Sequence, residues 1–342
     1  MDYIFRNLVF EGGGVKGIAY VGAMKILAEK GILSQIERVG GTSAGAINAL
    51  LLGLNYSLTE TEEILGDLDF NNFMDDTWGL IRDSKRLIEE FGWYQGNFFR
   101  DWIGELIRRK TGNSEATFAE VNRQKSENGF KDLYFIGTNL STGFAEVFSY
   151  EHTPRKCLAD AVRISMSIPL FFAACTSDRG DVYVDGGVMD NYPIKLFDRK
   201  KYVPTAFFKE PSYYRDHNIA LEKANKDLSP YVYNMETLGF RLDSAKEIAV
   251  FRDQAEPPRY EIDDFFTYAW RLVETILNLQ NSAHLHSDDW QRTVYIDTLG
   301  VKTTQFDLDD HLKDALKKSG EDCATAYFRW YDDPANHPAN RP

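Results

Sequence analysis

The sequence predicts an α/β protein with a mainly parallel central sheet and an inserted helical cap. Short apolar strands alternate with helices from the start of the chain, and glycine-rich turns follow the first two strands. The 342 residues, of which 43% are hydrophobic and 14% aromatic, supply enough apolar surface for a large core. We therefore expect one elaborated domain.

The N-terminal segment contains two successive strand-turn-helix units. Apolar residues at helical spacing follow the first glycine-rich turn, and this helix is predicted to end at Gly31, a common C-cap residue. Two such units in succession favour a parallel sheet. The predicted elements are a strand at 7–10, a helix at 15–30, a strand at 36–39, a turn at 40–45 and a buried helix at 46–54.

The rest of the chain is expected to elaborate this core. A helical cap is predicted at about 59–115, and the tyrosine-rich stretch 207–260 is predicted to be an irregular loop or lid. Further strands are predicted at 133–138, 145–149, 182–184 and 294–296, and further helices at 157–167, 264–279 and 309–330. The expected domain plan is a core at 1–205, a lid loop with a helical and strand extension at 206–332, and a flexible tail at 333–342.

Composition and charge argue against several classes of protein. The net charge of −13, from 39 basic and 52 acidic residues, opposes nucleic-acid binding. Cys157, Cys175 and Cys323 are widely spaced and form no CxxC pair, so we expect neither a disulfide framework nor a zinc site. The sequence shows no cleavable signal and no apolar stretch of the roughly 18 residues that span a membrane. We expect a cytoplasmic or peripheral membrane protein without metal or cofactor, and any export would use a signal-independent system.

A GxSxG sequence lies between the second predicted strand and the helix that follows it. Small residues at this point allow the sharp turn that exposes a serine hydroxyl, and the helix N-terminus offers backbone N–H groups to an oxyanion. The serine is therefore predicted to be a nucleophile. The motif consists of Gly41, Thr42, Ser43, Ala44 and Gly45.

The glycine-rich turn after the first strand has two interpretations. A dinucleotide site would require an acidic residue at the end of the next strand, where the chain instead runs through 39–41 into the serine turn. The interpretation that we favour is an oxyanion hole, because glycines let backbone N–H groups approach a tetrahedral intermediate. The GxGxxG glycines are Gly12, Gly14 and Gly17, and the predicted oxyanion residues are Gly12, Gly13, Gly14 and Ala44.

A serine nucleophile needs a base, and two sources are open. Of the six histidines, His284 and His286 come late in the chain, as the histidine of a Ser-His-Asp triad does in α/β-hydrolases. Only one strand, however, precedes the strand that leads into the serine turn, whereas that fold places several there. The other source is Asp185, which is predicted to end a strand just before Gly186 and Gly187 and to reach the serine directly.

These motifs together resemble the patatin-like phospholipases, which share a glycine-rich oxyanion loop, a GxSxG nucleophile and an Asp-Gly-Gly or Asp-Gly-Ala base motif. The stretches 137–143 and 164–172 are also similar to that family, so the resemblance covers at least 7–198, and 234–239 resembles bacterial members. Many members carry arginine where this chain has Lys16.

The resemblance implies a three-layer α/β/α patatin-like fold and a Ser-Asp dyad that hydrolyses ester bonds of phospholipids or other acyl lipids and releases free fatty acid. Aromatic-rich segments at 70–99 and 202–233 are expected to line an acyl groove or touch a bilayer, with anchors around Trp78 and Trp93. The alternatives are a Ser-His-Asp esterase or thioesterase, an acyltransferase, and a catalytically silent lipid- or nucleotide-binding module. The sequence indicates neither an activator nor an oligomeric state.

Overall fold

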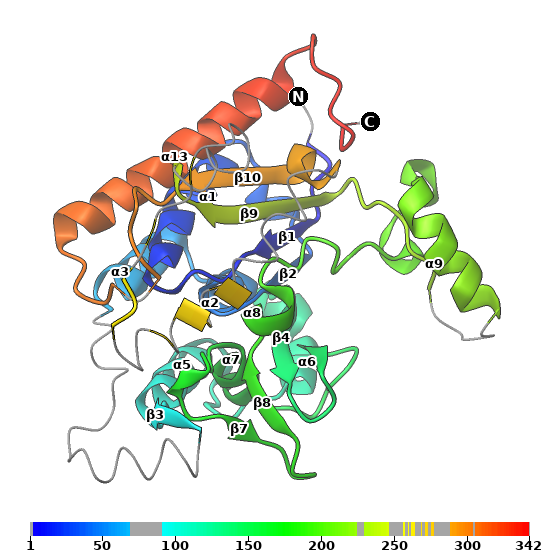
Figure 1. The fold of residues 1–342 in the computed structure, drawn as a ribbon. Coiled ribbons are helices and arrows are strands. Elements are labelled where there is room, and N and C mark those ends of the chain that lie inside the picture. Colours follow the sequence, from blue (N-terminus) through cyan, green and yellow to red (C-terminus); the bar gives the residue numbers. More distant parts are fainter. Residues whose placement is uncertain are drawn as a thin grey trace.

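The computed structural model describes residues 3–68, 91–223, 229–245, 288–303 and 305–341, and a few positions between 256 and 276. Within these residues, helices pack against one large mixed sheet (Figure 1). The expectation of an α/β protein with a mainly parallel sheet is confirmed.

The chain begins with the two strand-turn-helix units that the sequence predicts. The strands are β1 (Asn7–Phe10), β2 (Arg38–Gly41), β3 (Gly92–Tyr94), β4 (Asp132–Asn139), β5 (Phe144–Ser149), β6 (Leu170–Phe172), β7 (Cys175–Thr176), β8 (Val182–Asp185), β9 (Thr237–Asp243) and β10 (Thr293–Asp297). The α-helices are α1 (Ala19–Glu29), α2 (Ala44–Gly53), α3 (Leu58–Gly66), α5 (Asn97–Thr111), α6 (Phe118–Asn128), α7 (Leu158–Ser165), α8 (Gly187–Asp190), α9 (Ser212–Lys223) and α13 (Asp310–Asp332). Short 3-10 helices are η1 (Gly14–Ile18), η2 (Leu33–Gln35), η4 (Lys200–Tyr202), η5 (Thr205–Phe207) and η6 (Asp288–Arg292).

Eight strands of the described residues form the large sheet, in the order β10-β9-β1-β2-β4-β8-β7, with β5 also paired to β4. The strands from β10 to β4 are parallel. At β4 the sheet changes from parallel to antiparallel, because both β5 and β8 pair with this strand in antiparallel fashion. A separate two-stranded sheet joins β3 and β6.

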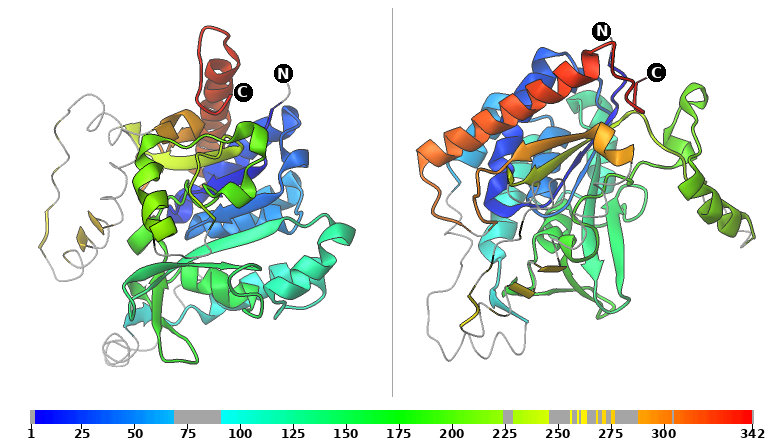
Figure 2. Two further views of the ribbon diagram at one scale, coloured as in Figure 1. Left: turned by 90° about the vertical axis from the view of Figure 1, so that its right-hand side faces the viewer. Right: turned by 45° about the horizontal axis from the view of Figure 1, so that its top comes forward.

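The sheet separates two apolar cores. Leu8 and Phe10 of β1 belong to the larger core, on the face covered by α1, α2 and α13, whereas Val9 between them belongs to the smaller core. Because successive side chains of a strand point to opposite faces, β1 is buried on both sides. The second face is covered by α8 and by the chain from 191 to 203, which completes the three layers (Figure 2).

The first and last long helices pack closely along one another. Figure 1 shows α13 lying across α1 and β10 on one side of the sheet. A Cβ atom on Gly22 of α1 would overlap the carbonyl oxygen of Lys317, and one on Gly320 of α13 would overlap that of Ala19. The two backbones therefore approach each other at a distance that only glycine permits.

The segment 207–260 differs from the irregular loop that the sequence predicts. It contains helix α9, and it contains β9, which lies inside the sheet between β1 and β10. The strand was hard to recognise because it carries charged residues: Arg241 Nη2 donates to Asp243 Oδ1 at 2.8 Å in the protein interior. Such charges become compatible with burial only through partners that the fold supplies.

The last described residues form hydrogen bonds with the end of α13. Asn340 is completely buried, and its carbonyl oxygen accepts a hydrogen bond of 2.9 Å from the Tyr331 hydroxyl. Arg341 donates through Nη1 to the Tyr331 carbonyl oxygen at 2.6 Å. These contacts join the last described residues to the end of α13, and the flexibility of the tail at 333–342 stays a prediction.

The predicted cap is described only at its two ends, by α3 and by α5, which packs against α7. Residues 69–90 of the cap, and most of the predicted helix 264–279, lie outside the described residues. In the described part of the chain, no helix is long and apolar enough to cross a membrane.

We expect Gly22→Ala to lower the free energy of unfolding by about 1–3 kcal/mol, because the added methyl group must push α1 and α13 apart. The matched control is Gly66→Ala at the end of α3, where an added Cβ would have no heavy atom within 4 Å. That change should leave stability unchanged or raise it by up to about 1 kcal/mol. Urea unfolding followed by circular dichroism measures both, and equal stabilities for the two variants would contradict the close packing of the helices.

Candidate active site

Ser43 occupies the sharp turn that the GxSxG pattern predicts. Its backbone has φ 54° and ψ −126°, a conformation that non-glycine residues rarely adopt. Such a residue stores about 1–3 kcal/mol of strain and persists where its surroundings fix it. The Ser43 N–H donates to Ser165 Oγ at 3.0 Å, and Ser43 Oγ lies 3.4 Å from Met166 Sδ.

The glycines of this motif are required for close packing. A Cβ on Gly45 would overlap the carbonyl oxygen of Phe10 at the end of β1, and a Cβ on Gly41 would overlap the carbonyl oxygen of Gly45. The first turn of α2 can therefore lie directly against the ends of β1 and β2. This arrangement brings the glycine-rich loop after β1 next to Ser43, because the carboxyl ends of parallel strands share one edge of a sheet.

Asp185 reaches the same edge along a different route. The strand β8 that it ends runs antiparallel to β4, and Asp185 pairs with Gly137. On the other side, Gly41 of β2 pairs with Phe135 of β4, so Ser43 and Asp185 are both level with the middle of this long strand. The length of β4 thus lets two strands of opposite direction end at one point.

The Asp185 carboxyl group is buried, with 2% of the residue exposed. Burial raises its pKa to about 7, and the N–H of Gly187 and the nearby Ser43 hydroxyl offset only part of that effect. Oδ1 accepts the Gly187 N–H at 2.7 Å, whereas Oδ2 has no partner of normal hydrogen-bond geometry among the described residues. The contact with Ser43 is therefore looser than a full hydrogen bond, as is common in enzymes without substrate.

In the glycine-rich loop, the N–H group of Gly12 has a hydrogen-bond acceptor, whereas those of Gly13 and Gly14 have none among the described residues. The Gly12 N–H donates to the Asn191 carbonyl oxygen at 3.0 Å, so the expectation that Gly12 is an oxyanion donor is not supported by its hydrogen bonding. Among the described residues, no acceptor binds the N–H groups of Gly13, Gly14 or Ala44. Gly14 has φ +56°, which makes glycine favourable there, and the three free amides remain the predicted donors.

Three further residues hold this site together: Asn191, which the sequence analysis did not single out, and Ser165 and Ser167, which lie in the family-like stretch 164–172. Asn191 donates through Nδ2 to the Gly12 carbonyl oxygen at 3.2 Å, and it follows the Asp-Gly-Gly turn closely enough to have been suspected. Ser165 accepts from Ser43, and the Ser167 carbonyl oxygen accepts the Asp185 N–H at 2.8 Å. The end of α7 therefore supports both predicted catalytic residues.

Glu11 forms a buried polar cluster directly before the glycine-rich loop. Its Oε2 accepts the Leu242 N–H at 2.7 Å and lies 3.8 Å from Arg241 Nε, and its Oε1 accepts from Asn191 Nδ2 at 3.3 Å. Burial raises the Glu11 pKa to about 7, and the charge of Arg241 opposes this rise. The cluster ties the loop after β1 to β9.

The structure brings no described histidine to Ser43. His152 bonds to Ser149 Oγ at 2.7 Å, and His217 Nδ1 lies 3.3 Å from the Tyr213 carbonyl oxygen. His284 and His286, the candidates for a triad, lie outside the described residues, as does Trp78. The side chain of Trp93 is likewise not among those described.

A strained serine turn, a glycine-rich loop and a buried carboxylate lie together at one sheet edge of this α/β protein. Comparison with known proteins assigns the family. A model described as patatin-like phospholipase matches residues 8–198, more than half of the chain. The chain belongs to the patatin-like phospholipase family.

The chain is also similar to individual proteins from other organisms. The chain is 34% identical over 194 residues to protein R571 of Acanthamoeba polyphaga mimivirus, covering 56% of this chain and 61% of R571. It is 27% identical over 328 residues to YqhO of Bacillus subtilis, covering 92% of this chain and 94% of YqhO. The crystal structure of VipD from Legionella pneumophila shares the fold, with a TM-score of 0.58 and 17% identity over 95% of this chain and 67% of VipD.

The backbone strain at Ser43 can be measured by comparing two variants that both lack the hydroxyl. We expect Ser43→Gly to be more stable than Ser43→Ala by about 1 kcal/mol, because glycine tolerates a positive φ. At the exposed Ser34 the order should reverse, because this residue lies in a regular 3-10 helix without a positive φ. Thermal unfolding of the four variants gives the two differences, and the same sign at both positions would argue against strain at Ser43.

Proposed function

We propose that the protein is a serine acyl hydrolase that cleaves ester bonds of lipids, with Ser43 as nucleophile and Asp185 as base. The observation that carries the proposal is the Asp185 carboxylate, buried beside the serine turn with its pKa raised to about 7. A carboxylate at its ordinary pKa is too weak a base for a serine hydroxyl, and burial strengthens it. Among the described residues, no cationic side chain contributes to its pKa.

The proposed reaction has two halves. Asp185 accepts the proton of Ser43 as Oγ attacks the acyl carbonyl carbon, and the ester C–O bond breaks while the leaving alcohol takes the proton. Water then attacks the acyl-enzyme as Asp185 accepts a proton from it, the bond between the acyl carbon and Ser43 Oγ breaks while Oγ takes that proton, and free fatty acid leaves. The amides of Gly13, Gly14 and Ala44 are proposed to donate to the oxyanion in both halves, because each is free in the described structure.

Membership of the patatin-like phospholipase family supports a lipid substrate. The sheet edge that carries the site also exposes large apolar side chains: Leu140 and Phe144 at the turn between β4 and β5, and Met189 on α8. Their exposed fractions of 53%, 69% and 46% are high for such residues. A rim of this kind suits peripheral contact with a lipid surface, from which the substrate would enter.

The alternatives differ from this proposal in measurable ways. A Ser-His-Asp esterase or thioesterase would lose activity on replacement of a histidine, and an acyltransferase would move the acyl group to an alcohol instead of water. A silent lipid- or nucleotide-binding module would have no reactive serine. Asp185, with its raised pKa next to Ser43, favours the dyad over each of them.

We expect Ser43→Ala and Asp185→Asn each to reduce fatty-acid release from phospholipid by at least about 10³-fold, because each removes one half of the dyad. Mass spectrometry of the lipid products measures the loss and distinguishes free fatty acid from transfer products. Asp178→Asn and Ser34→Ala, both at exposed positions, serve as charge-matched and hydroxyl-matched controls with unchanged rates. Retained activity in either dyad variant, with a native circular dichroism spectrum, would refute the assignment.

The raised pKa of Asp185 predicts the pH dependence of the reaction. The base must be ionised, so kcat/KM should fall below pH 7 and approach a tenfold decrease per unit of pH well below it. A serine-specific fluorophosphonate should label Ser43 with the same acid limb. A rate that stays constant between pH 5 and pH 8 would contradict a base with this pKa.

Linkage gives the sign of the accompanying change in stability. The native state keeps the Asp185 proton to higher pH than the unfolded chain, whose carboxyl has its ordinary pKa near 3.8. The native state therefore loses stability as the pH rises from there through about 7. Relative to wild type, Asp185→Asn should become progressively more stable over this range, and a constant difference would argue against the raised pKa.

A further inference from the structure

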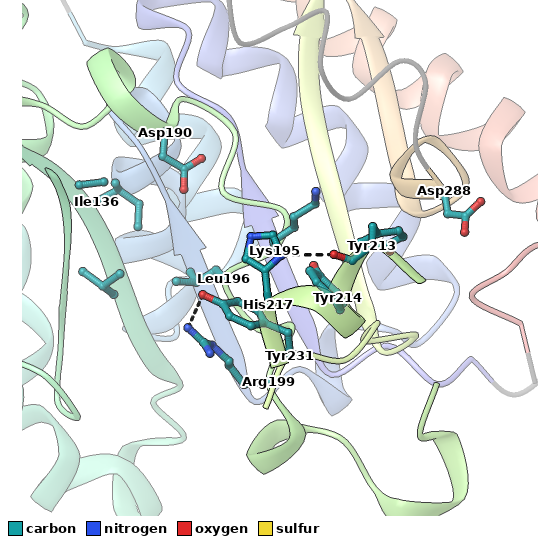
Figure 3. A pocket seen from close by; sticks show the side chains of 12 residues that line it. Ile136, Asp190, Lys195, Leu196, Arg199, Tyr213, Tyr214, His217, Tyr231 and Asp288 are labelled. Carbon is teal, nitrogen blue, oxygen red and sulfur yellow. Dashed lines mark hydrogen bonds between the residues drawn. The ribbon is translucent and has the colours of Figure 1, made fainter. Parts of the chain in front are cut away.

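A cavity lies apart from Ser43 and Asp185, on the face of the sheet that α8 and the chain from 191 to 203 cover. Its volume is about 830 Å³, which falls within the roughly 300–1,000 Å³ of small-molecule sites. It lies between strands β4 and β5, the chain from 190 to 199, and α9 with the segment at Tyr231. Figure 3 shows the side chains that line it.

The cavity has one apolar wall and one aromatic wall. Ile136, Ala145 and Val147 extend from β4 and β5, and Leu196 adds a further aliphatic side chain. Opposite them lie three tyrosines of α9 and the following segment, which are Tyr213, Tyr214 and Tyr231. A space bounded in this way suits a hydrocarbon chain.

Cationic side chains enter this largely apolar space. Arg199 stacks on the Tyr231 ring at 3.4 Å and donates to two neutral oxygens, the Tyr231 hydroxyl at 2.6 Å and the Ser229 carbonyl at 3.0 Å. No carboxylate of the described residues pairs with it. A half-buried guanidinium without a carboxylate is unusual, because buried charges are normally paired.

Lys195 and His217 are the other basic residues of the lining. Lys195 Nζ lies 3.7 Å from Asp289 Oδ2, but the other oxygen of Asp289 already accepts from Arg292 at 2.6 Å. His217 contacts a carbonyl oxygen through Nδ1, and its second ring nitrogen has no partner among the described residues. In Figure 3 these three basic residues lie between the two acidic residues of the lining, Asp190 and Asp288.

We infer that this cavity binds a single-chain amphiphile with an anionic headgroup. The chain would lie against the aliphatic and tyrosine walls, and the headgroup would supply the counter-charge that Arg199 lacks among the described residues. A fatty-acid carboxylate and a lysophospholipid phosphate share this chemistry. The guanidinium of Arg199 binds either group through two parallel N–H donors.

The inference does not depend on catalysis at Ser43. Asp190 belongs to the cavity, and its carbonyl oxygen accepts from Thr42 Oγ1 at 2.9 Å, one residue before Ser43. The bound amphiphile would therefore lie next to the helix that follows Asp185, yet no atom of the proposed dyad lines the cavity. Binding can be tested in a chain that has no nucleophile.

Binding is measured by calorimetry on the full chain carrying Ser43→Ala, below the micelle-forming concentration of each probe. The probes are oleate, oleoyl lysophosphatidate and the neutral oleyl alcohol, which share one hydrocarbon chain. We expect one or both anions to bind at least about tenfold more tightly than the alcohol, as charge-assisted hydrogen bonds would give. Tighter binding of oleate identifies a carboxylate site, and tighter binding of the lysophosphatidate identifies a phosphate site.

Variants assign this binding to the cavity. Arg199→Gln, added to Ser43→Ala, should weaken the anions about tenfold and leave the alcohol unchanged, since only the charge contact is lost. Lys200→Gln is the control, because it makes the same charge change on the next residue, which does not line the cavity. Ala145→Trp, at an exposed strand position, should weaken all three probes by filling the space.

Three outcomes would overturn the inference. The first is equal affinity for the anions and the alcohol, and the second is unchanged affinity in both Arg199→Gln and Ala145→Trp. The third is an equal loss in Lys200→Gln, which would indicate a general charge effect. Should Arg199→Gln not fold, Arg199→Lys and Ala145→Trp decide the question, because lysine keeps the charge and loses only the paired donors.

Discussion

The candidate site is built around one carboxyl group, that of Asp185, which is buried without a cationic partner among the described residues. Asp185 is held by the Gly187 N–H and by the pairing of β8 with β4, and desolvation dominates its pKa. A nearby arginine or lysine would stabilise the carboxylate and make it a weaker base. The fold instead accepts an energetic cost at this position, as proteins do at functional sites. The strained backbone of Ser43 is a second cost at the same place.

The parts of this site that could be predicted from the sequence are those with local causes. A serine turn between a strand and a helix, and an aspartate followed by glycines, follow from backbone sterics within a few residues. Ser43 and Asp185 therefore stood out, as did β1 and the helix after it. The start of this helix is harder to predict, because the chain enters α1 through a 3-10 turn that has the same apolar spacing as the helix.

The parts that were missed have distant causes. Strand β9 pairs with β1 across most of the chain, and its Arg241 is buried only because Glu11 and Asp243 lie beside it. Asn191 contributes to the site because it forms hydrogen bonds with Gly12, which lies far from it in the sequence. Arg292 likewise bridges Asp198 and Asp289 in the interior. A polar residue of this kind looks like a surface residue until its partner is known.

The position of β9 has a consequence for the boundaries of a stable folding unit. The family match ends at 198, yet β1 borders β9 on one side and is buried on both faces. A fragment that stopped at 198 would leave β1 as an uncovered edge strand with apolar side chains on both faces, which is a template for aggregation. During synthesis the N-terminal strands can complete their packing only after β9, β10 and α13 have been made. Contacts between such distant segments give the chain a high contact order, which predicts slow folding.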